Sequence, residues 1–196
     1  MELADVLAID VCTYEYTPRP MVYPSETAPV VVQERGQTEM RALRWGLVPH
    51  WADDEKIGNK MINARSETAA QKPAFREAWK HRRCLVPATG FYEWNRREGT
   101  RQPFHFQSPD QGLFCFAGLW ERWERPPTAQ GELFADAFDS GPAVVETFTI
   151  LTTTPNDVVA PFHDRMPVII RDPEVWLKHG EGGQDSFSGE LTATPA

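Results

Sequence analysis

Three short segments, far apart in the chain, carry polar side chains that can transfer protons or bind phosphate. Residues 62–68 read INARSET, residues 90–94 read GFYEW, and residues 162–167 read FHDRMP. They place an amide, a carboxylate, an imidazole and guanidinium groups inside stretches that otherwise look structural. Such groups serve general acid–base chemistry and the binding of phosphate oxygens. The segments form a candidate site if the fold brings them together.

Glu93 lies between Tyr92 and Trp94 in a predicted strand, close to Phe91. A carboxylate among aromatic rings loses hydration, which suits it for proton transfer near neutral pH. The alternative is a glutamate on the solvent face of an edge strand. Taken without the other two segments, the sequence favours that alternative.

His163 follows a predicted short helix and precedes Asp164 and Arg165. An imidazole can shuttle a proton or donate to a phosphate, and a guanidinium can bind phosphate through two N–H groups. Adjacent side chains generally diverge, so His163 and Asp164 are not expected to act as a dyad. By itself, a histidine in this position is more often a capping or packing residue.

Asn63 and Arg65 stand two residues apart, so on an extended segment they project to the same face. That arrangement suits a phosphate clamp, although Asn-Ala-Arg alone has almost no specificity. Trp45 and Trp51 bound the segment WGLVPHW, and with seven tryptophans in the chain most must lie in the core. A base stacked on an aromatic ring contributes about 1–3 kcal/mol. Trp51, in a Pro-flanked loop, is predicted to stack on a base, and Trp45 to pack in the core.

Taken together and in this order, INARSET, GFYEW and FHDRMP resemble the SOS-response-associated peptidase (SRAP) family, whose members attach covalently to abasic sites in single-stranded DNA. The resemblance covers most of the chain, from WGLVPHW through FHDRMP. It implies that Asn63, Glu93 and His163 are catalytic residues around an N-terminal cysteine. The cysteine α-amine would attack the aldehyde of the ring-opened sugar to give a Schiff base, and the thiol would close a thiazolidine ring.

The resemblance also implies a role for each residue. Glu93 would transfer protons in both steps and in removal of the initiator methionine, Asn63 would position the amine, and His163 would contact the sugar-phosphate and assist ring opening. Abasic single-stranded DNA is the expected partner, with no cofactor and no metal. The predicted DNA-binding residues are Arg65, Trp51, Thr152, Arg165 and Pro24.

The chain departs from the family at its start. Members begin Met-Cys-Gly-Arg, whereas this chain begins Met1-Glu2, and Met21 stands where members usually carry an asparagine. The N- and C-terminal ends are expected to be truncated relative to the family, and the chain as written is expected to be inactive in crosslinking. Two explanations stay open: ends missing from the recorded chain, and a degenerate paralogue.

Two other functions also stay open. A non-covalent module that binds single-stranded DNA or junctions would keep the DNA groove without the covalent chemistry. A thiol hydrolase would use Cys84 or Cys12 with His163. Cys84 lies in an apolar run, where a thiol is more often a small core residue than a nucleophile.

Composition indicates a soluble globular protein: 196 residues, 41% hydrophobic and 24% charged. No apolar run approaches the about 20 residues of a membrane helix, and no secretory signal is visible. Three cysteines without CxxC spacing argue against a disulfide framework or zinc site, so a reducing cytoplasm is expected. The sequence does not fix the oligomeric state, and a monomer is the expectation. Net charge is −8, yet residues 61–101 hold nine Lys/Arg and four Glu. This basic block could bind phosphate or be a solvated helix face.

The expected fold is α+β, a single SRAP-like domain spanning 1–196. Strands outnumber helices and short turns join them, which predicts a mainly antiparallel sheet. The resemblance adds that the sheet is twisted and curled into an open barrel with peripheral helices. Residues 126–142 are expected to be a flexible loop, and the tail 182–196 to pack little. Strands are predicted at 28–34, 41–47, 84–88, 91–96, 103–107, 113–123, 147–154 and 166–171, and helices at 67–83, 156–163 and 173–178.

Overall fold

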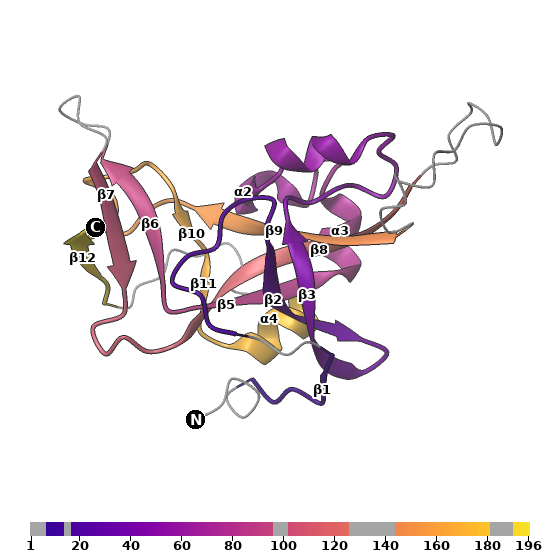
Figure 1. The fold of residues 1–196 in the computed structure, drawn as a ribbon, viewed down its shortest axis with the longest axis horizontal. Coiled ribbons are helices and arrows are strands. Elements are labelled where there is room, and N and C mark those ends of the chain that lie inside the picture. Colours follow the sequence, from indigo (N-terminus) through magenta and orange to yellow (C-terminus); the bar gives the residue numbers. More distant parts are fainter. Residues whose placement is uncertain (1–6, 14–16, 96–101, 126–143, 181–189) are drawn as a thin grey trace.

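The strands of the computed structural model form two sheets (Figure 1). The structure describes residues 7–13, 17–95, 102–125, 144–180 and 190–196. Within these residues, one sheet has nine strands and the other has three. The predicted loop at 126–142 lies outside the described residues.

Five strands of the larger sheet form a ring. They are β2 (Thr27–Glu34), β3 (Gln37–Trp45), β5 (Arg83–Ala88), β8 (Phe114–Glu124) and β9 (Val144–Thr153). Neighbours in the order β3-β2-β5-β8-β9 pair antiparallel, and a short parallel contact between β3 and β9 closes the ring. The α+β class and the mainly antiparallel barrel are confirmed. The barrel was expected to be open, but the contact between β3 and β9 closes it.

Four short strands extend this sheet: β1 (Val11–Cys12) on β3, β4 (Asn63–Arg65) and β10 (Met166–Pro167) on β9, and β11 (Ile169–Ile170) on β8. The predicted strand 166–171 is therefore two short strands separated by Val168. Because β4 and β10 both pair with β9, residues from two of the three motifs meet along one strand.

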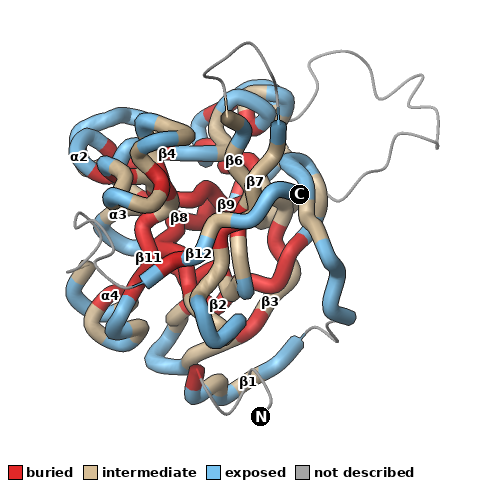
Figure 2. The backbone as a smooth tube through the Cα atoms, turned by 90° about the vertical axis from the view of Figure 1, so that its left-hand side faces the viewer, coloured by how far each residue is buried: buried red, intermediate tan, exposed pale blue. Residues whose placement is uncertain are grey.

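The barrel is buried on two sides. On β2, Val30 and Val32 contact the cluster inside the barrel, whereas Val31 contacts a second cluster that includes Trp176. A run of β-branched residues suits such a strand, because both of its faces exclude water. Figure 2 shows burial concentrated along the barrel strands and low in β1 and β12.

The smaller sheet comprises β6 (Gly90–Asn95), β7 (Gln102–Gln107) and β12 (Thr192–Pro195), all antiparallel. It lies at one end of the molecule in Figure 1. Phe91 stacks on Phe106 at 5.1 Å between ring centroids and meets Phe116 of the barrel edge-on at 6.0 Å. The expectation that the tail packs little is wrong for residues 190–196, because β12 pairs with β7 and Leu191 is buried in the barrel cluster.

The predicted helix at 67–83 is two short helices, α2 (Ser66–Ala69) and α3 (Arg76–His81), with turns between them. Pro73 explains the break, because the residue before a proline avoids the helical region. Residues 157–162 form turns rather than the predicted helix, although Asn156 Oδ1 does accept from the Val159 N–H. The 3₁₀ helix η1 (Glu55–Lys60) was not predicted. The last helix, α4 (Pro173–His179), is as predicted: the Asp172 side chain caps its start.

Candidate active site

The site lies where the connection from β9 to β10 meets the small sheet. Phe162, at the end of this connection, packs its ring against Phe104 at 4.5 Å and Phe106 at 5.4 Å. Both partners are on β7, so the contact docks the connection onto the small sheet. It also brings the next residue, His163, beside β6.

Glu93 lies on the inner face of the small sheet. In a strand, residues two apart share a face, so Glu93 lies on the same side as the buried Phe91. Tyr92 faces the other side, where its ring pairs with His105 at 4.7 Å, and Trp94 is 45% exposed there. The solvent-face alternative for Glu93 is therefore wrong, because the register of β6 turns this carboxylate toward the barrel.

Glu93 and His163 meet. The Glu93 Oε1 lies 3.8 Å from His163 Nδ1, and the two side chains are 22% and 21% exposed. This separation exceeds hydrogen-bond reach, so the carboxylate and the imidazole can act on one bound group between them or exchange a proton through a bridging water. The structure thus brings together residues 70 positions apart that the sequence singled out separately.

The backbone of Arg165 orients His163. Its N–H lies 3.1 Å from His163 Nδ1 and its carbonyl oxygen 3.0 Å from the same atom. Nδ1 accepts from the N–H in one tautomer and donates to the carbonyl in the other. Either way Nε2 is the nitrogen left to face a ligand. Asp164 Oδ1 is 3.5 Å away and its side chain is 83% exposed, so it contributes less to the orientation.

Asn63 and Arg65 share a face, as predicted. Both are exposed on β4, with the buried Ala64 between them. Parallel pairing sets Asn63 opposite Ile150 and Arg65 opposite Thr152 of β9.

The segment before Asn63 is held by Trp45, whose Nε1 donates to the Ile62 carbonyl at 2.8 Å. Trp45 also stacks on Phe148 at 6.2 Å and packs against the barrel cluster, which confirms its predicted core position. Gly46 (φ 126°) touches Gly58 so closely that a Cβ on Gly46 would lie 2.6 Å from the Gly58 carbonyl oxygen. Two glycines are needed here so that the loop can fold back and deliver β4 to β9.

Arg165 is already engaged by a carboxylate. Its Nη1 and Nη2 donate to the two oxygens of Glu67 at 2.7 and 2.9 Å, and Nη2 also donates to the Thr152 carbonyl. Hydrogen bonding from Arg165 holds the pKa of the Glu67 carboxyl below its ordinary value. Glu67 belongs to the INARSET motif, but no role was predicted for it, because nothing in the local sequence indicates a partner 98 residues away.

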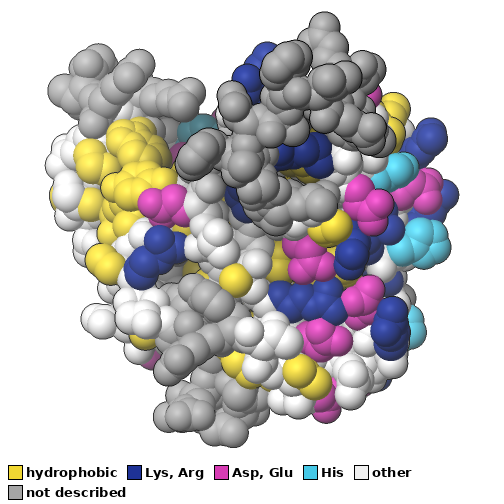
Figure 3. Space-filling view, turned by 45° about the vertical axis from the view of Figure 1, so that its right-hand side comes forward, with side chains coloured by type: hydrophobic (Ala, Val, Ile, Leu, Met, Phe, Trp, Pro, Cys, Tyr) yellow, Lys and Arg dark blue, Asp and Glu magenta, His cyan; other side chains and the backbone are white. Residues whose placement is uncertain are grey.

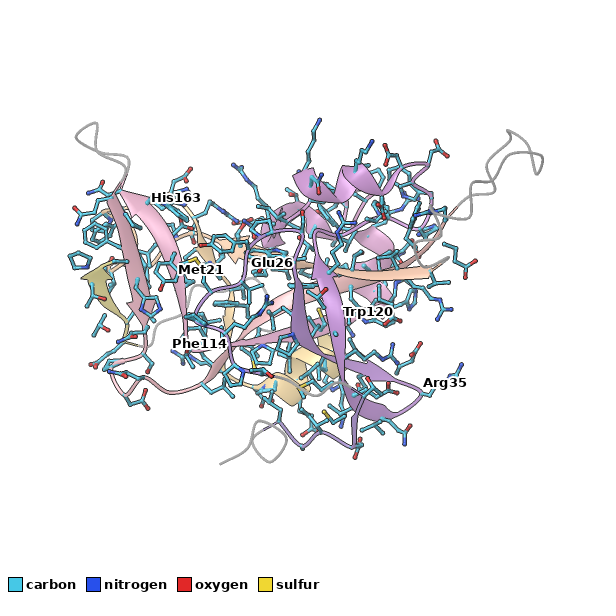
Figure 4. All side chains as sticks on the ribbon, viewed as in Figure 1. Met21, Glu26, Arg35, Phe114, Trp120 and His163 are labelled. Atoms are coloured by element: carbon cyan, nitrogen blue, oxygen red, sulfur yellow. The ribbon has the colours of Figure 1, made fainter. Side chains whose placement is uncertain are left out.

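Arg65, Thr152 and Arg165 therefore come together around the end of β9. Pro24 is exposed, in the segment before β2 that also carries Met21. In Figure 4, Met21 and His163 are both labelled near the border between the small sheet and the barrel.

Trp51 does not belong to this cluster. It is 50% exposed, as a stacking residue should be, but the next residue, Ala52, accepts a hydrogen bond from Trp123. Trp123 pairs with Val145, seven residues before Thr152 on β9, which corresponds to about 23 Å of strand. A base stacked on Trp51 would lie several nucleotides from the Glu93–His163 pair.

Comparison with family models matches residues 2–195 to the model described as SOS response associated peptidase (SRAP). The chain belongs to the SRAP family. Abasic site processing protein YoqW of Bacillus subtilis is 42% identical over 166 residues, which cover 83% of this SRAP chain and 68% of YoqW. Abasic site processing protein HMCES of Xenopus tropicalis is 28% identical over 199 residues, covering 85% and 56% of the two chains.

Solved structures share the fold. A Bordetella bronchiseptica protein superposes with a TM-score of 0.76 at 25% identity, covering 99% of this chain and 93% of that one. A Bacteroides thetaiotaomicron protein gives a TM-score of 0.71 at 28% identity, with coverage of 87% and 74%.

In this SRAP chain the cysteine thiols do not meet His163. Cys84 is fully buried, which raises the pKa of its thiol well above the ordinary value, and burial raises the pKa of Cys115 to about 12. Cys12 is exposed on β1, which lies at the lower edge of the molecule in Figure 1, whereas His163 is labelled near the upper edge in Figure 4. This geometry does not support the thiol hydrolase alternative.

The basic block divides in the structure. Arg83 donates to carbonyls of Trp79 (2.7 Å) in α3 and Lys178 (2.9 Å) in α4, and Arg82 pairs with the buried Glu121 at 2.8 Å. Acidic and basic side chains also alternate on the face shown in Figure 3. Part of the block therefore serves the fold rather than a ligand.

Two kinds of feature are absent from the described residues. Among these residues no group of three or more His, Cys, Asp and Glu side chains could hold a metal ion. No helix among them is long and apolar enough to cross a membrane.

Proposed function

We propose that this protein processes abasic sites in DNA, the activity that the names of its relatives state for them. The observation that carries the proposal is the Glu93–His163 contact of 3.8 Å on the inner face of the small sheet. Asn63 and Arg65 lie on β4, which pairs with β9, and Arg165, two residues after His163, donates to the Thr152 carbonyl of β9. The arrangement joins a proton-transfer pair to a cationic edge that suits a sugar-phosphate backbone.

The proposed chemistry starts from an N-terminal cysteine. Its amine nitrogen attacks the C1′ aldehyde of the opened sugar, and water leaves to give a Schiff base. The thiol then adds across the C=N bond and closes a thiazolidine. Glu93 donates the proton that the departing hydroxyl needs, Asn63 holds the amine, and His163 Nε2 contacts the sugar-phosphate. The same Glu93 would serve the peptidase step that exposes the cysteine.

Single-stranded DNA is the proposed partner, because it is the substrate that the family resemblance implies and because Arg65 is exposed to contact a phosphate backbone. The contact residues proposed on this strand are Arg65, Thr152, Arg165, Pro24 and, several nucleotides away, Trp51. A monomeric state, a cytoplasmic location and the absence of a cofactor stay predictions.

The second candidate is non-covalent binding of single strands or junctions. The observation that favours it is the pair of cations Arg65 and Arg165, which can hold a strand without a thiol, whereas Cys84 and Cys115 are buried. The test uses a polypeptide that consists of residues 1–196 alone. Such a polypeptide should bind abasic single strands without forming an adduct that survives heat on a denaturing gel.

A graft separates the two candidates. Placing Met-Cys-Gly-Arg and a short helix-forming linker ahead of Glu2 should produce a heat-stable adduct with an abasic single strand and none with the intact strand. A graft with Ser in place of Cys is the matched control and should bind without crosslinking. A graft that binds but stays inert would favour the non-covalent module, and one that binds no single strand would contradict both candidates.

A further inference from the structure

Glu67 occupies the side of Arg165 that a phosphate would use. The two Nη atoms donate to two oxygens of one carboxylate at 2.7 and 2.9 Å. Arginine binds phosphate through the same two-pronged geometry. A carboxylate held in this way occupies the place of two phosphate oxygens. Glu67 and a DNA phosphate therefore cannot both bind this fork, the Nη1 and Nη2 atoms of Arg165.

The two partners of Arg165 differ in how easily they leave. The carbonyl of Thr152 belongs to the backbone of a barrel strand, and the Arg165 side chain is only 16% exposed. The guanidinium therefore has little freedom to swing away. Glu67 is 43% exposed, so water can replace its contacts at small cost when another anion arrives.

Arg65 adds to the same local field. The hydrogen bonds and charge of Arg165 lower the pKa of Glu67 most, and the charge of Arg65 lowers it further, so the carboxylate stays ionised. Without the Glu67 carboxylate, the two cations on β4 and on the segment before β10 would attract any phosphate backbone.

We propose that Glu67 is a specificity-determining residue that competes with DNA phosphate for Arg165. In the free protein its carboxylate holds the fork. A strand displaces it only when further contacts, those of an abasic sugar with Asn63, Glu93 and His163, supply the missing free energy. Intact strands are thereby held weakly. This inference rests on the proposed function, because it concerns the same strand-binding edge.

The test measures binding of fluorescein-labelled intact and abasic single-stranded oligonucleotides by anisotropy at constant salt. Glu67→Gln should bind the intact strand about fivefold more tightly than the parent and lose part of its preference for the abasic strand. In the Arg165→Ala or Arg165→Lys background the same change should have no effect. Glu174→Gln is the matched control, because it removes an exposed carboxylate paired with Lys178 on α4 and should leave affinity within twofold.

Each contrary result has a distinct meaning. Weaker binding of the intact strand by Glu67→Gln would show that Glu67 only positions Arg165. An equal gain in affinity in the Arg165 variants would show that removing the Glu67 charge acts generally on DNA binding. Either result would overturn the proposed competition. Failure of the parent to bind any single strand would overturn the proposed function as well.

Discussion

Two halves of the candidate site, Glu93 with His163 and Arg65 with Arg165, are held in place by different interactions. Aromatic packing of Phe162 on Phe104 and Phe106 brings His163 to Glu93. The Arg165 half depends on an exposed ion pair with Glu67 and on a backbone carbonyl. Packing is insensitive to salt and hard to exchange, whereas an exposed ion pair is screened and exchangeable. The first half suits chemistry that needs fixed distances, and the second suits a ligand that must enter and leave.

The largest expected effect tests the chemical half. In the cysteine graft, Glu93→Gln should slow crosslinking by about 10²–10⁴-fold, the usual loss when a general acid–base group is removed. Binding of the intact strand should change little, because that strand lacks the opened sugar on which Glu93 is proposed to act. The rate is measured by quenching at intervals and running denaturing gels. Glu190→Gln, an exposed carboxylate just before β12, is the control; an unchanged rate in Glu93→Gln would remove this carboxylate from the chemistry.

The next prediction tests how that half is held. Phe162→Ala should lower the free energy of unfolding by about 2–3 kcal/mol, below the range for a fully buried phenylalanine because this ring is partly exposed. It should also release the His163 ring, visible as line broadening of its NMR signals. Phe162→Leu, which keeps most of the apolar contact, should retain most of the stability. Denaturant titration gives the comparison, and a sharp His163 signal in the alanine variant would contradict it.

Arg65→Ala, unlike Phe162→Ala, should lower DNA affinity and leave stability almost unchanged. Because its side chain is exposed, unfolding free energy should change by no more than about 0.5 kcal/mol. Affinity for single strands should fall for all base compositions alike, since phosphate contacts position without reading bases. The slope of log K against log salt should become shallower by about 0.7, the value for one phosphate contact on a single strand. An unaltered slope would place Arg65 outside the interface.

The smallest effect concerns pH. The folded-state pKa of Glu67 lies below its ordinary value of 4.5, so its pairing with Arg165 stabilises the fold above that value and the contribution is lost as pH falls through the folded pKa. The difference in unfolding free energy between the parent and Glu67→Gln should therefore be up to about 1 kcal/mol at pH 7 and vanish at low pH. Urea titrations across that range measure it, and a difference that persists at the acid end would contradict the assignment.

Local patterns in the sequence were enough to identify the motifs and to show which residues of one strand share a face, but not which face is buried. Alternation along a strand puts Asn63 and Arg65 on one face, and Glu93 with Phe91 on another, because the side-chain period of two is a property of the extended backbone itself. The same patterns predicted a mainly antiparallel sheet, whereas the order of the barrel strands came only from the structure. The extent of one domain over 1–196 stays a prediction.

Long-range contacts decided the rest. The meeting of Glu93 with His163 and the pairing of Arg165 with Glu67 depend on segments at least 70 residues apart. The inward face of β6 depends on the packing of Phe91 against Phe116 of the barrel. The same holds for the tail, where β12 adds to β7 although its own residues show no strong strand pattern. Sequence alone states which groups are present and which side of a strand they share. The partner of each group follows only when apolar burial has selected one packing of the sheets, because that packing sets the distances on which charge and proton transfer depend.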